Sequence, residues 1–132
     1  MRPHQGVLLD THTLMWCLSG NTLVSPRLRN ILDSDRSVMY SAISIAEIHI
    51  KASIGKLPSQ EGLVDKIHSI GLRELPFDSA SAASLDRFPG LFRHDPFDRM
   101  LVAQASTHKL YFETTDTRLL SLNLPGVRDA RA

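Results

Sequence analysis

Several features that define whole classes of protein are scarce or absent in this sequence of 132 residues. It has one cysteine, Cys17, so no disulfide can form within the chain, and we expect a reducing compartment. No apolar run approaches the roughly 20 residues that a membrane-spanning helix needs. The opening "MRPHQG" lacks the apolar segment of a secretion signal. We therefore expect a cytoplasmic protein with no membrane partner.

An excess of charge of one sign is lacking as well. Fifteen Lys and Arg residues stand against fourteen Asp and Glu, so the formal net charge is +1. The chain thus has no strong basic signature of nucleic-acid binding, although acids gathered in a site would mask one. Seven basic residues could form a local rim, but a scattered solvated surface explains them better: Arg27, Arg29, Lys51, Lys56, Arg93, Arg99 and Arg118.

What the sequence does contain is an alternation of short apolar runs with helical patterns, which indicates an α/β fold. The length and the 42% share of hydrophobic residues predict one domain over residues 1–132. Strands are expected at 7–9, 37–41, 72–77, 110–116 and 126–130. Helices are expected around 14–18 and at 25–34, 41–55, 60–71, 78–88, 95–109 and 117–122. Helical crossovers between strands predict a mostly parallel sheet with helices on both faces.

Two acids directly follow predicted strands. Asp10 comes after the apolar run Val7–Leu9, and Asp116 comes after "YFETT" at 111–115. In open α/β sheets, ligand sites lie beyond the carboxyl ends of the strands, where helix N-termini also point. Both carboxylates should therefore reach the same edge of the sheet.

Two further acids interrupt the apolar faces of predicted helices. Glu47 lies four residues after Ile43 and three before Ile50, so it falls on or beside an apolar stripe. Asp98 begins a stripe that continues through Leu101. An unpaired buried carboxylate is strongly unfavourable, so the needs of a core alone do not explain these positions.

Each acid taken alone also has an ordinary structural explanation. Asp98 lies in the first turn of its helix, where the helix dipole and capping favour a negative charge. Asp116 could cap the turn at 117–122, and Glu47 could form an exposed ion pair with Lys51. These explanations stay open for single acids, but they do not explain why two acids stand at strand ends.

The four acids together indicate a metal site. Close carboxylates repel one another, and Mg²⁺ or Mn²⁺ would relieve this repulsion because both cations prefer oxygen ligands. Zinc is disfavoured, since the six histidines and Cys17 show no ligand spacing. A site made of acids alone indicates phosphoryl chemistry, in which the metal activates a water against a phosphodiester. No Ser or Cys stands in a nucleophile motif such as G-x-S-x-G.

Five blocks of the sequence, in this order, resemble the PIN-domain family, and in particular the VapC-type toxins of bacterial type II toxin–antitoxin pairs. The blocks are "LLDTHTLMW", "SAISIAEIHIKASIGKL", "LPFD", "DPFDRMLVAQA" and "TTDTRL". The resemblance implies a three-layer α/β/α domain with a central, mostly parallel sheet, a pocket that binds Mg²⁺ or Mn²⁺, and endoribonuclease activity on RNA. It also implies a homodimer and a cognate protein antitoxin whose C-terminal segment blocks the active site.

On this resemblance, the catalytic and metal-binding residues are four acids: Asp10, Glu47, Asp98 and Asp116. We hypothesise that Asp10 and Asp98 bind the principal metal. Glu47 and Asp116 would complete the charge cluster and position the water, and Asp116 matches the family position that varies most.

Supporting roles follow from the same resemblance. Thr11, Ser44 and Thr114 match polar positions that hydrogen-bond the carboxylates or a phosphate, with simple capping as the alternative. Asp95 is interpreted as a helix cap or as a group just outside the metal ligands. Trp16 shows no usable pattern and is expected in the core or in the dimer interface.

Two other functions compete with a metal-dependent ribonuclease. The motif "DTHT" after a strand resembles the motif of phosphatases that use an aspartate as nucleophile. Those phosphatases need a second acid at the position that His12 occupies here. A non-catalytic PIN-fold module that binds RNA or protein is the other alternative, and the presence of all four acids disfavours it. The four acids therefore predict a hydrolase acting on phosphodiesters, and the resemblance implies that these belong to RNA.

Overall fold

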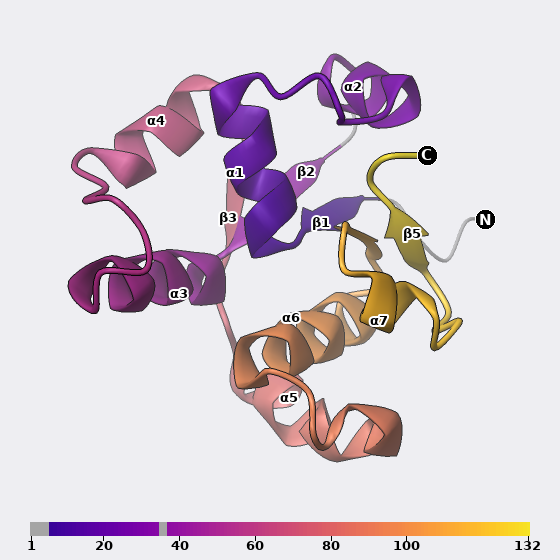
Figure 1. The fold of residues 1–132 in the computed structure, drawn as a ribbon. Helices are drawn as coiled ribbons and strands as arrows, with labels where there is room; N and C mark the ends of the chain where they lie inside the picture. The colour runs from indigo at the N-terminus through magenta and orange to yellow at the C-terminus, as the bar shows by residue number, and fades with distance from the viewer. Residues whose placement is uncertain (1–5, 35–36) are drawn as a thin grey trace.

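The computed structural model describes residues 6–34 and 37–132, and its centre is a five-stranded sheet (Figure 1). The strands are β1 (Val7–Leu9), β2 (Val38–Ser41), β3 (Arg73–Leu75), β4 (Tyr111–Thr114) and β5 (Val127–Asp129). Their order across the sheet is β3-β2-β1-β4-β5, and each neighbouring pair is parallel. β1 is therefore the central strand, and the residues that follow it lie in the middle of one sheet edge.

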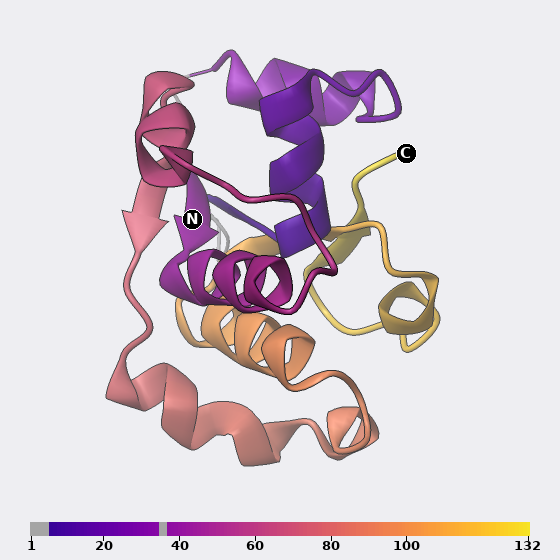
Figure 2. The same cartoon turned by 60° about the vertical axis from the view of Figure 1, so that its left-hand side comes forward.

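Helices cover both faces of the sheet (Figure 1, Figure 2). One face carries α1 (Thr11–Ser19), α2 (Pro26–Leu32) and α4 (Leu63–Ser69). The other carries α5 (Ser79–Ala83), α6 (Pro96–Thr107) and α7 (Thr117–Leu120), with the short 3₁₀ turns η1 (Ser84–Arg87) and η2 (Pro89–Leu91). The helix α3 (Ala42–Ser53) contacts both α1 and α6. The predicted three-layer α/β/α architecture is confirmed.

The apolar run of β1 forms a strand because both of its faces are buried. Val7 and Leu9 pack into the core beneath α1 and α2, whereas Leu8 points into the opposite core with Phe112 and Leu101. All five side chains are at most 1% exposed. A continuous apolar run, rather than an alternating one, is the expected pattern for such a strand.

Most of the predicted helices are present, and side-chain caps fix several of their starts. Ser25 caps α2 by accepting from the Leu28 amide at 3.0 Å, and Asp78 caps α5 by accepting from the Ser81 amide at 2.9 Å. The prediction of one helix over 78–88 is wrong in part, because the α-helix ends at Ala83 and continues as η1. Among the described residues, no helix is both long and apolar enough to span a membrane.

Candidate active site

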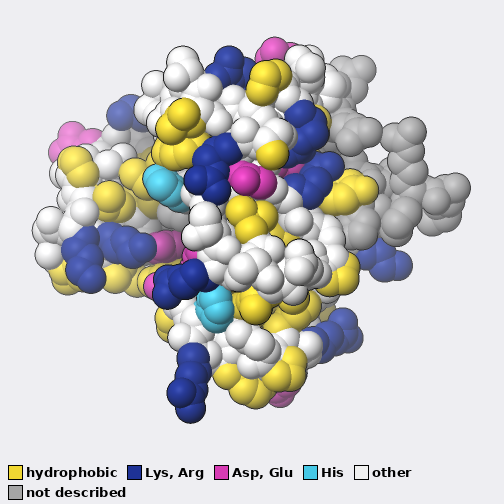
Figure 3. Space-filling view, turned by 45° about the vertical axis from the view of Figure 1, so that its right-hand side comes forward, with side chains coloured by type: hydrophobic (Ala, Val, Ile, Leu, Met, Phe, Trp, Pro, Cys, Tyr) yellow, Lys and Arg dark blue, Asp and Glu magenta, His cyan; other side chains and the backbone are white. Residues whose placement is uncertain are grey.

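A cleft of about 480 Å³ lies at the edge where β1 and β4 end and where α1 and α7 begin. All four predicted acids line it. On the face drawn in Figure 3, basic side chains gather around acidic ones. The lining residues are Asp10, Thr11, His12, Trp16, Glu47, Lys51, Asp98, Thr115, Asp116, Thr117, Arg118 and Arg131.

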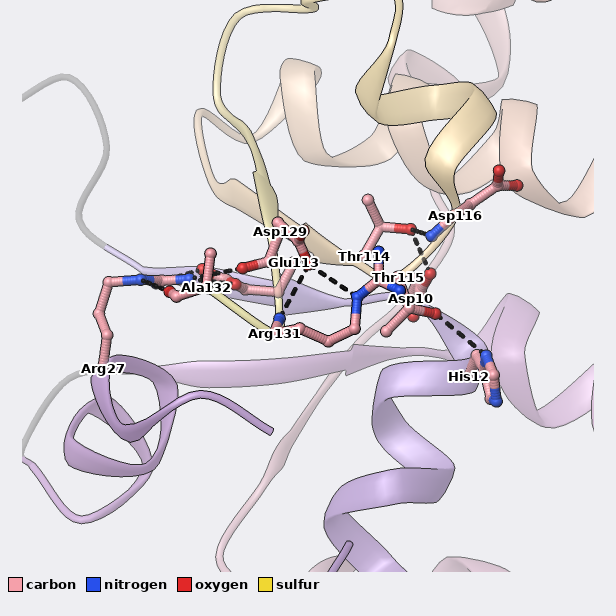
Figure 4. A network of polar contacts seen from close by, with 10 residues as sticks. All are labelled: Asp10, His12, Arg27, Glu113, Thr114, Thr115, Asp116, Asp129, Arg131 and Ala132. Carbon is pink, nitrogen blue, oxygen red and sulfur yellow. Dashed lines mark hydrogen bonds and ion pairs between the residues drawn. The ribbon is translucent and has the colours of Figure 1, made fainter. Parts of the chain in front are cut away.

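Asp10 is fixed at the end of the central strand, and it is only 4% exposed. Its Oδ1 accepts a hydrogen bond of 2.7 Å from the Thr13 amide, which makes Asp10 the N-cap of α1. Its Oδ2 accepts a bond of 2.5 Å from the Thr114 hydroxyl on β4 (Figure 4). Burial raises the pKa of Asp10, and these hydrogen bonds partly oppose the rise. The carboxylate is thus desolvated and held in one orientation.

Glu47 enters the cleft from α3 and is 5% exposed. Its Oε1 accepts a hydrogen bond of 2.7 Å from the Thr11 hydroxyl, which also contacts the Ser44 hydroxyl at 2.8 Å. Its Oε2 is hydrogen-bonded and ion-paired to the ammonium of Lys51, one turn later on the same helix. The Lys51 pair expected from the sequence is present, but its acid is buried rather than exposed.

Asp98 is the least compensated acid of the cleft. It lies in the first turn of α6, and its pKa is raised from 3.8 to about 7. Burial is the largest cause, followed by the negative charges of Asp95, Glu47, Asp10 and Asp116. Among the described residues, none donates a hydrogen bond to its carboxylate. Asp98 therefore lies close enough to acids from other segments for their negative charges to act on it.

Asp116 and Asp95 both cap helices, as the structural alternatives allowed. Asp116 caps α7 by accepting from the Arg118 amide at 2.8 Å, and its own amide donates to the Thr114 hydroxyl at 3.0 Å. Asp95 caps α6 by accepting from the Phe97 amide at 2.8 Å. Capping and a place at the cleft do not exclude each other, since Asp116 lines the cleft while it caps α7.

The other three supporting residues differ in what they contact. Thr11 hydrogen-bonds Glu47, and Thr114 hydrogen-bonds Asp10, so both touch carboxylates as the resemblance implied. Ser44 contacts the Thr11 hydroxyl instead of an acid, so it acts on Glu47 only through Thr11.

The wall formed by α1 is aromatic. The ring Nδ1 of His12 lies 3.0 Å from the Thr115 hydroxyl across the cleft (Figure 4). The His12 and Trp16 rings meet edge to face, with their centroids 5.1 Å apart. Trp16 packs partly against the core, as expected, and also lines the cleft, a position that the sequence did not predict.

Cations of the cleft come from three separate parts of the chain. Lys51 and Arg118 belong to the seven residues that could have formed a basic rim, and Arg131 was not among them. Arg131 is ion-paired with Asp129 at 3.1 Å (Figure 4). Arg27, another of the seven, does not line the cleft and instead binds a buried acid.

That buried acid, Glu113 on β4, is a feature the sequence reasoning missed. Its side chain is fully buried, and Arg27 grips it with two hydrogen bonds of 2.8 and 2.9 Å (Figure 4). Nη2 of Arg128 lies 2.7 Å from it, and the Arg128 guanidinium stacks over the Tyr111 ring at 3.8 Å. A glutamate inside the predicted strand "LYFETT" was the available signal, because a strand interior rarely holds an unpaired charge.

The donor set at the cleft suits a hard divalent cation in its chemistry. Its candidate ligands are carboxylate oxygens, and a cation would relieve the repulsion that, after burial, contributes to the raised pKa of Asp98. In the described residues, no three His, Cys, Asp or Glu side chains stand in an arrangement ready to hold a metal. Glu47 instead faces Lys51, and Asp10 and Asp116 accept hydrogen bonds from helix amides.

Known structures share this fold. A toxin–antitoxin complex from Klebsiella pneumoniae has 19% identity and a TM-score of 0.69, and covers 95% of this chain and 98% of its own. DNA-bound VapBC from Salmonella typhimurium has 24% identity and a TM-score of 0.68, covering 94% and 96%. FitAcB from Neisseria gonorrhoeae has 25% identity and a TM-score of 0.60, covering 89% and 94%.

The family comparison agrees with the geometry. A search of curated proteins finds no match. The PIN domain, by contrast, matches residues 7–123, a span that begins with β1, ends just after α7 and includes all four acids of the cleft. The chain therefore belongs to the PIN domain family.

Proposed function

We propose that this protein is a metal-dependent endoribonuclease that acts as the toxin of a toxin–antitoxin pair. The observation that carries the proposal is the meeting of Asp10, Glu47, Asp98 and Asp116, from four separate segments, along one cleft. The pKa of Asp98, raised first by burial and then by the charges of the neighbouring acids, supports a functional rather than a structural role for the cleft.

Asp10 and Asp98 would hold the principal Mg²⁺ or Mn²⁺, and Glu47 and Asp116 would complete the ligand set. When bound, such a cation supplies a more acidic water and neutralises charge on the phosphodiester. Membership of the PIN domain family supports nuclease chemistry, and the choice of RNA rests on the resemblance to VapC-type toxins.

The chain's own side chains prepare this chemistry. Thr114 donates to Asp10 and accepts from the Asp116 amide, so one hydroxyl sets the positions of two acids. Thr11 fixes Glu47 in the same way. Arg118 and Arg131 line the cleft, where they would attract the phosphates that flank the scissile bond.

The comparison structures support the biological role. The Klebsiella protein is part of a toxin–antitoxin complex, and the Salmonella protein is in a VapBC complex on DNA. We propose for this chain a cognate protein antitoxin that covers the cleft, together with a homodimer as the family resemblance implies. No membrane partner is proposed, and a cytoplasmic site of action follows from an RNA substrate.

Cleavage of RNA oligonucleotides by the purified protein tests the activity. Cleavage is expected with Mg²⁺ or Mn²⁺, none with EDTA, and none by Asp98→Asn or Asp10→Asn. Metal-dependent binding without cleavage in any metal would identify a binding module instead. A phosphorylated Asp10 trapped during turnover of a phosphate ester would identify the phosphatase alternative.

Co-expression with the adjacent reading frame tests the toxin role. The neighbouring product is expected to co-purify with the chain, to suppress RNA cleavage, and to relieve growth arrest caused by the chain alone. Cleavage that this product leaves unchanged would contradict the antitoxin pairing and leave the nuclease activity standing.

A further inference from the structure

Lys51 is a cation that lines the acidic cleft. It lines the same cavity as the four acids and is bonded to Glu47 Oε2. Its pKa is raised first by that hydrogen bond and then by the charges of Glu47, Asp95 and Asp98. The ammonium thus interacts with several acids of the cluster, although about a third of the side chain remains exposed to solvent.

The pair with Glu47 is set up locally. A Glu followed by Lys four residues later is the favoured order for an ion pair on a helix, so α3 brings the two groups together by itself. The other oxygen of Glu47 accepts from Thr11, so both oxygens already have donors. A divalent cation that bound Glu47 would meet the Lys51 ammonium at the same carboxylate, where the two positive charges repel.

We propose that Lys51 is a built-in counter-cation of the metal site, which compensates Glu47 in the metal-free protein and must release it when the divalent cation binds. The inference rests on the proposed function and adds to it a control of metal affinity within the chain. Lys51 therefore stabilises the metal-free fold but weakens metal binding.

The test compares the full-length Lys51→Met variant with the wild type. Removal of the competitor is expected to strengthen Mn²⁺ binding, measured by isothermal titration calorimetry, by about tenfold. The same change is expected to lower the melting temperature in EDTA by a few degrees, because Glu47 is then buried without its cation. Saturating Mn²⁺ should bring the melting temperature of the variant back up.

Two controls separate competition from simpler effects. Arg131→Gln removes a cation that lines the same cleft but pairs with Asp129, so its gain in Mn²⁺ affinity should be much smaller. Lys56→Met removes an exposed lysine just beyond α3, and it should change neither affinity nor melting temperature.

The outcomes distinguish this inference from the proposed function. Unchanged or weaker Mn²⁺ binding by Lys51→Met, with tight binding by the wild type, would overturn the competition alone and make Lys51 a mere support for Glu47. A gain for Arg131→Gln equal to that for Lys51→Met would also overturn it. If the wild type binds neither Mn²⁺ nor Mg²⁺, the proposed metal-dependent function and the competition both fail.

Discussion

Two acids of this protein, one on a strand and one at the start of a helix, have opposite surroundings. Glu113 on β4 is gripped by Arg27 and lies against Arg128, so its charge is matched within the fold. Asp98 at the start of α6 faces other carboxylates, and its pKa is raised to about 7. We call Glu113 with its two arginines the balanced cluster, and the acids of the cleft around Asp98 the unbalanced cluster. The balanced cluster needs no other molecule to compensate its acid, whereas the unbalanced cluster lacks positive charge.

The two clusters are nevertheless in direct connection. The amide of Asp10 donates a backbone hydrogen bond of 2.9 Å to the carbonyl of Glu113. The balanced cluster, in which one acid contacts two arginines, joins α2, β4 and β5 and thus lies beside the unbalanced one. Burial of an acid is therefore no sign of function by itself, and the absence of a partner cation is the more informative feature.

The largest expected effect comes from breaking the balanced cluster. Glu113→Gln would leave Arg27 and Arg128 without their shared anion, so the free energy of unfolding should fall by about 3–5 kcal/mol. Urea denaturation measures the loss. The exposed Glu74 on β3 provides the control, since Glu74→Gln should change stability by less than about 0.5 kcal/mol. Equal effects of the two changes would mean that the buried pair contributes nothing special.

The next effect concerns activity in the unbalanced cluster. Asp98→Asn removes a proposed metal ligand, so RNA cleavage in Mg²⁺ or Mn²⁺ should fall by more than about 100-fold. Circular dichroism should show an intact fold. Asp86→Asn, at an exposed position in η1, is the matched control and should retain full cleavage. An active Asp98→Asn enzyme would contradict the assigned role.

A smaller effect is expected on stability in EDTA. The pKa of Asp98 is higher in the folded protein than its ordinary 3.8, so unfolding releases a proton between about pH 4 and 7. Asp98 therefore does not destabilise the fold below about pH 4. Its destabilising effect grows as the pH rises and reaches its full size above about pH 7.

Asp98→Asn removes this penalty. Above pH 7 the variant should be more stable than the wild type by about 1–2 kcal/mol, less than the full shift because the side chain keeps some contact with water. Thermal unfolding from pH 4 to pH 8 measures the difference, which should vanish at the acidic end. A constant difference across this range would exclude Asp98 as its source.

The smallest expected effect lies at the cleft rim. The Arg118 side chain is 78% exposed and 4.0 Å from Asp116. Arg118→Gln should therefore change the free energy of unfolding by less than about 0.5 kcal/mol. Chemical denaturation of Arg118→Gln and Glu113→Gln under the same conditions would compare the two arginine–carboxylate contacts by their loss of unfolding free energy.

The sequence predicts most of this fold because its signals are local. The apolar run Val7–Leu9, the cap at Ser25 and the Asp95 cap before Pro96 each specify an element within a few residues. Strand order is not local, and the order β3-β2-β1-β4-β5 could not be predicted from these signals.

The same distinction applies to the side chains. Lys51 is four residues from Glu47, so their pair was foreseeable, but the burial of Glu47 against Thr11 depends on how α1 and α3 pack. Glu113 and Arg27 are 86 residues apart, and nothing near either of them indicates the other. Tertiary packing decides which charges meet.

The position of Trp16 in the lining of the cleft has a practical consequence. It is the single tryptophan of the chain, and its indole meets the His12 ring beside the four acids. Intrinsic fluorescence excited at the indole band therefore arises from this one corner of the molecule. Occupation of the cleft by an ion, a nucleotide or a polypeptide segment can be followed optically on the unlabelled protein.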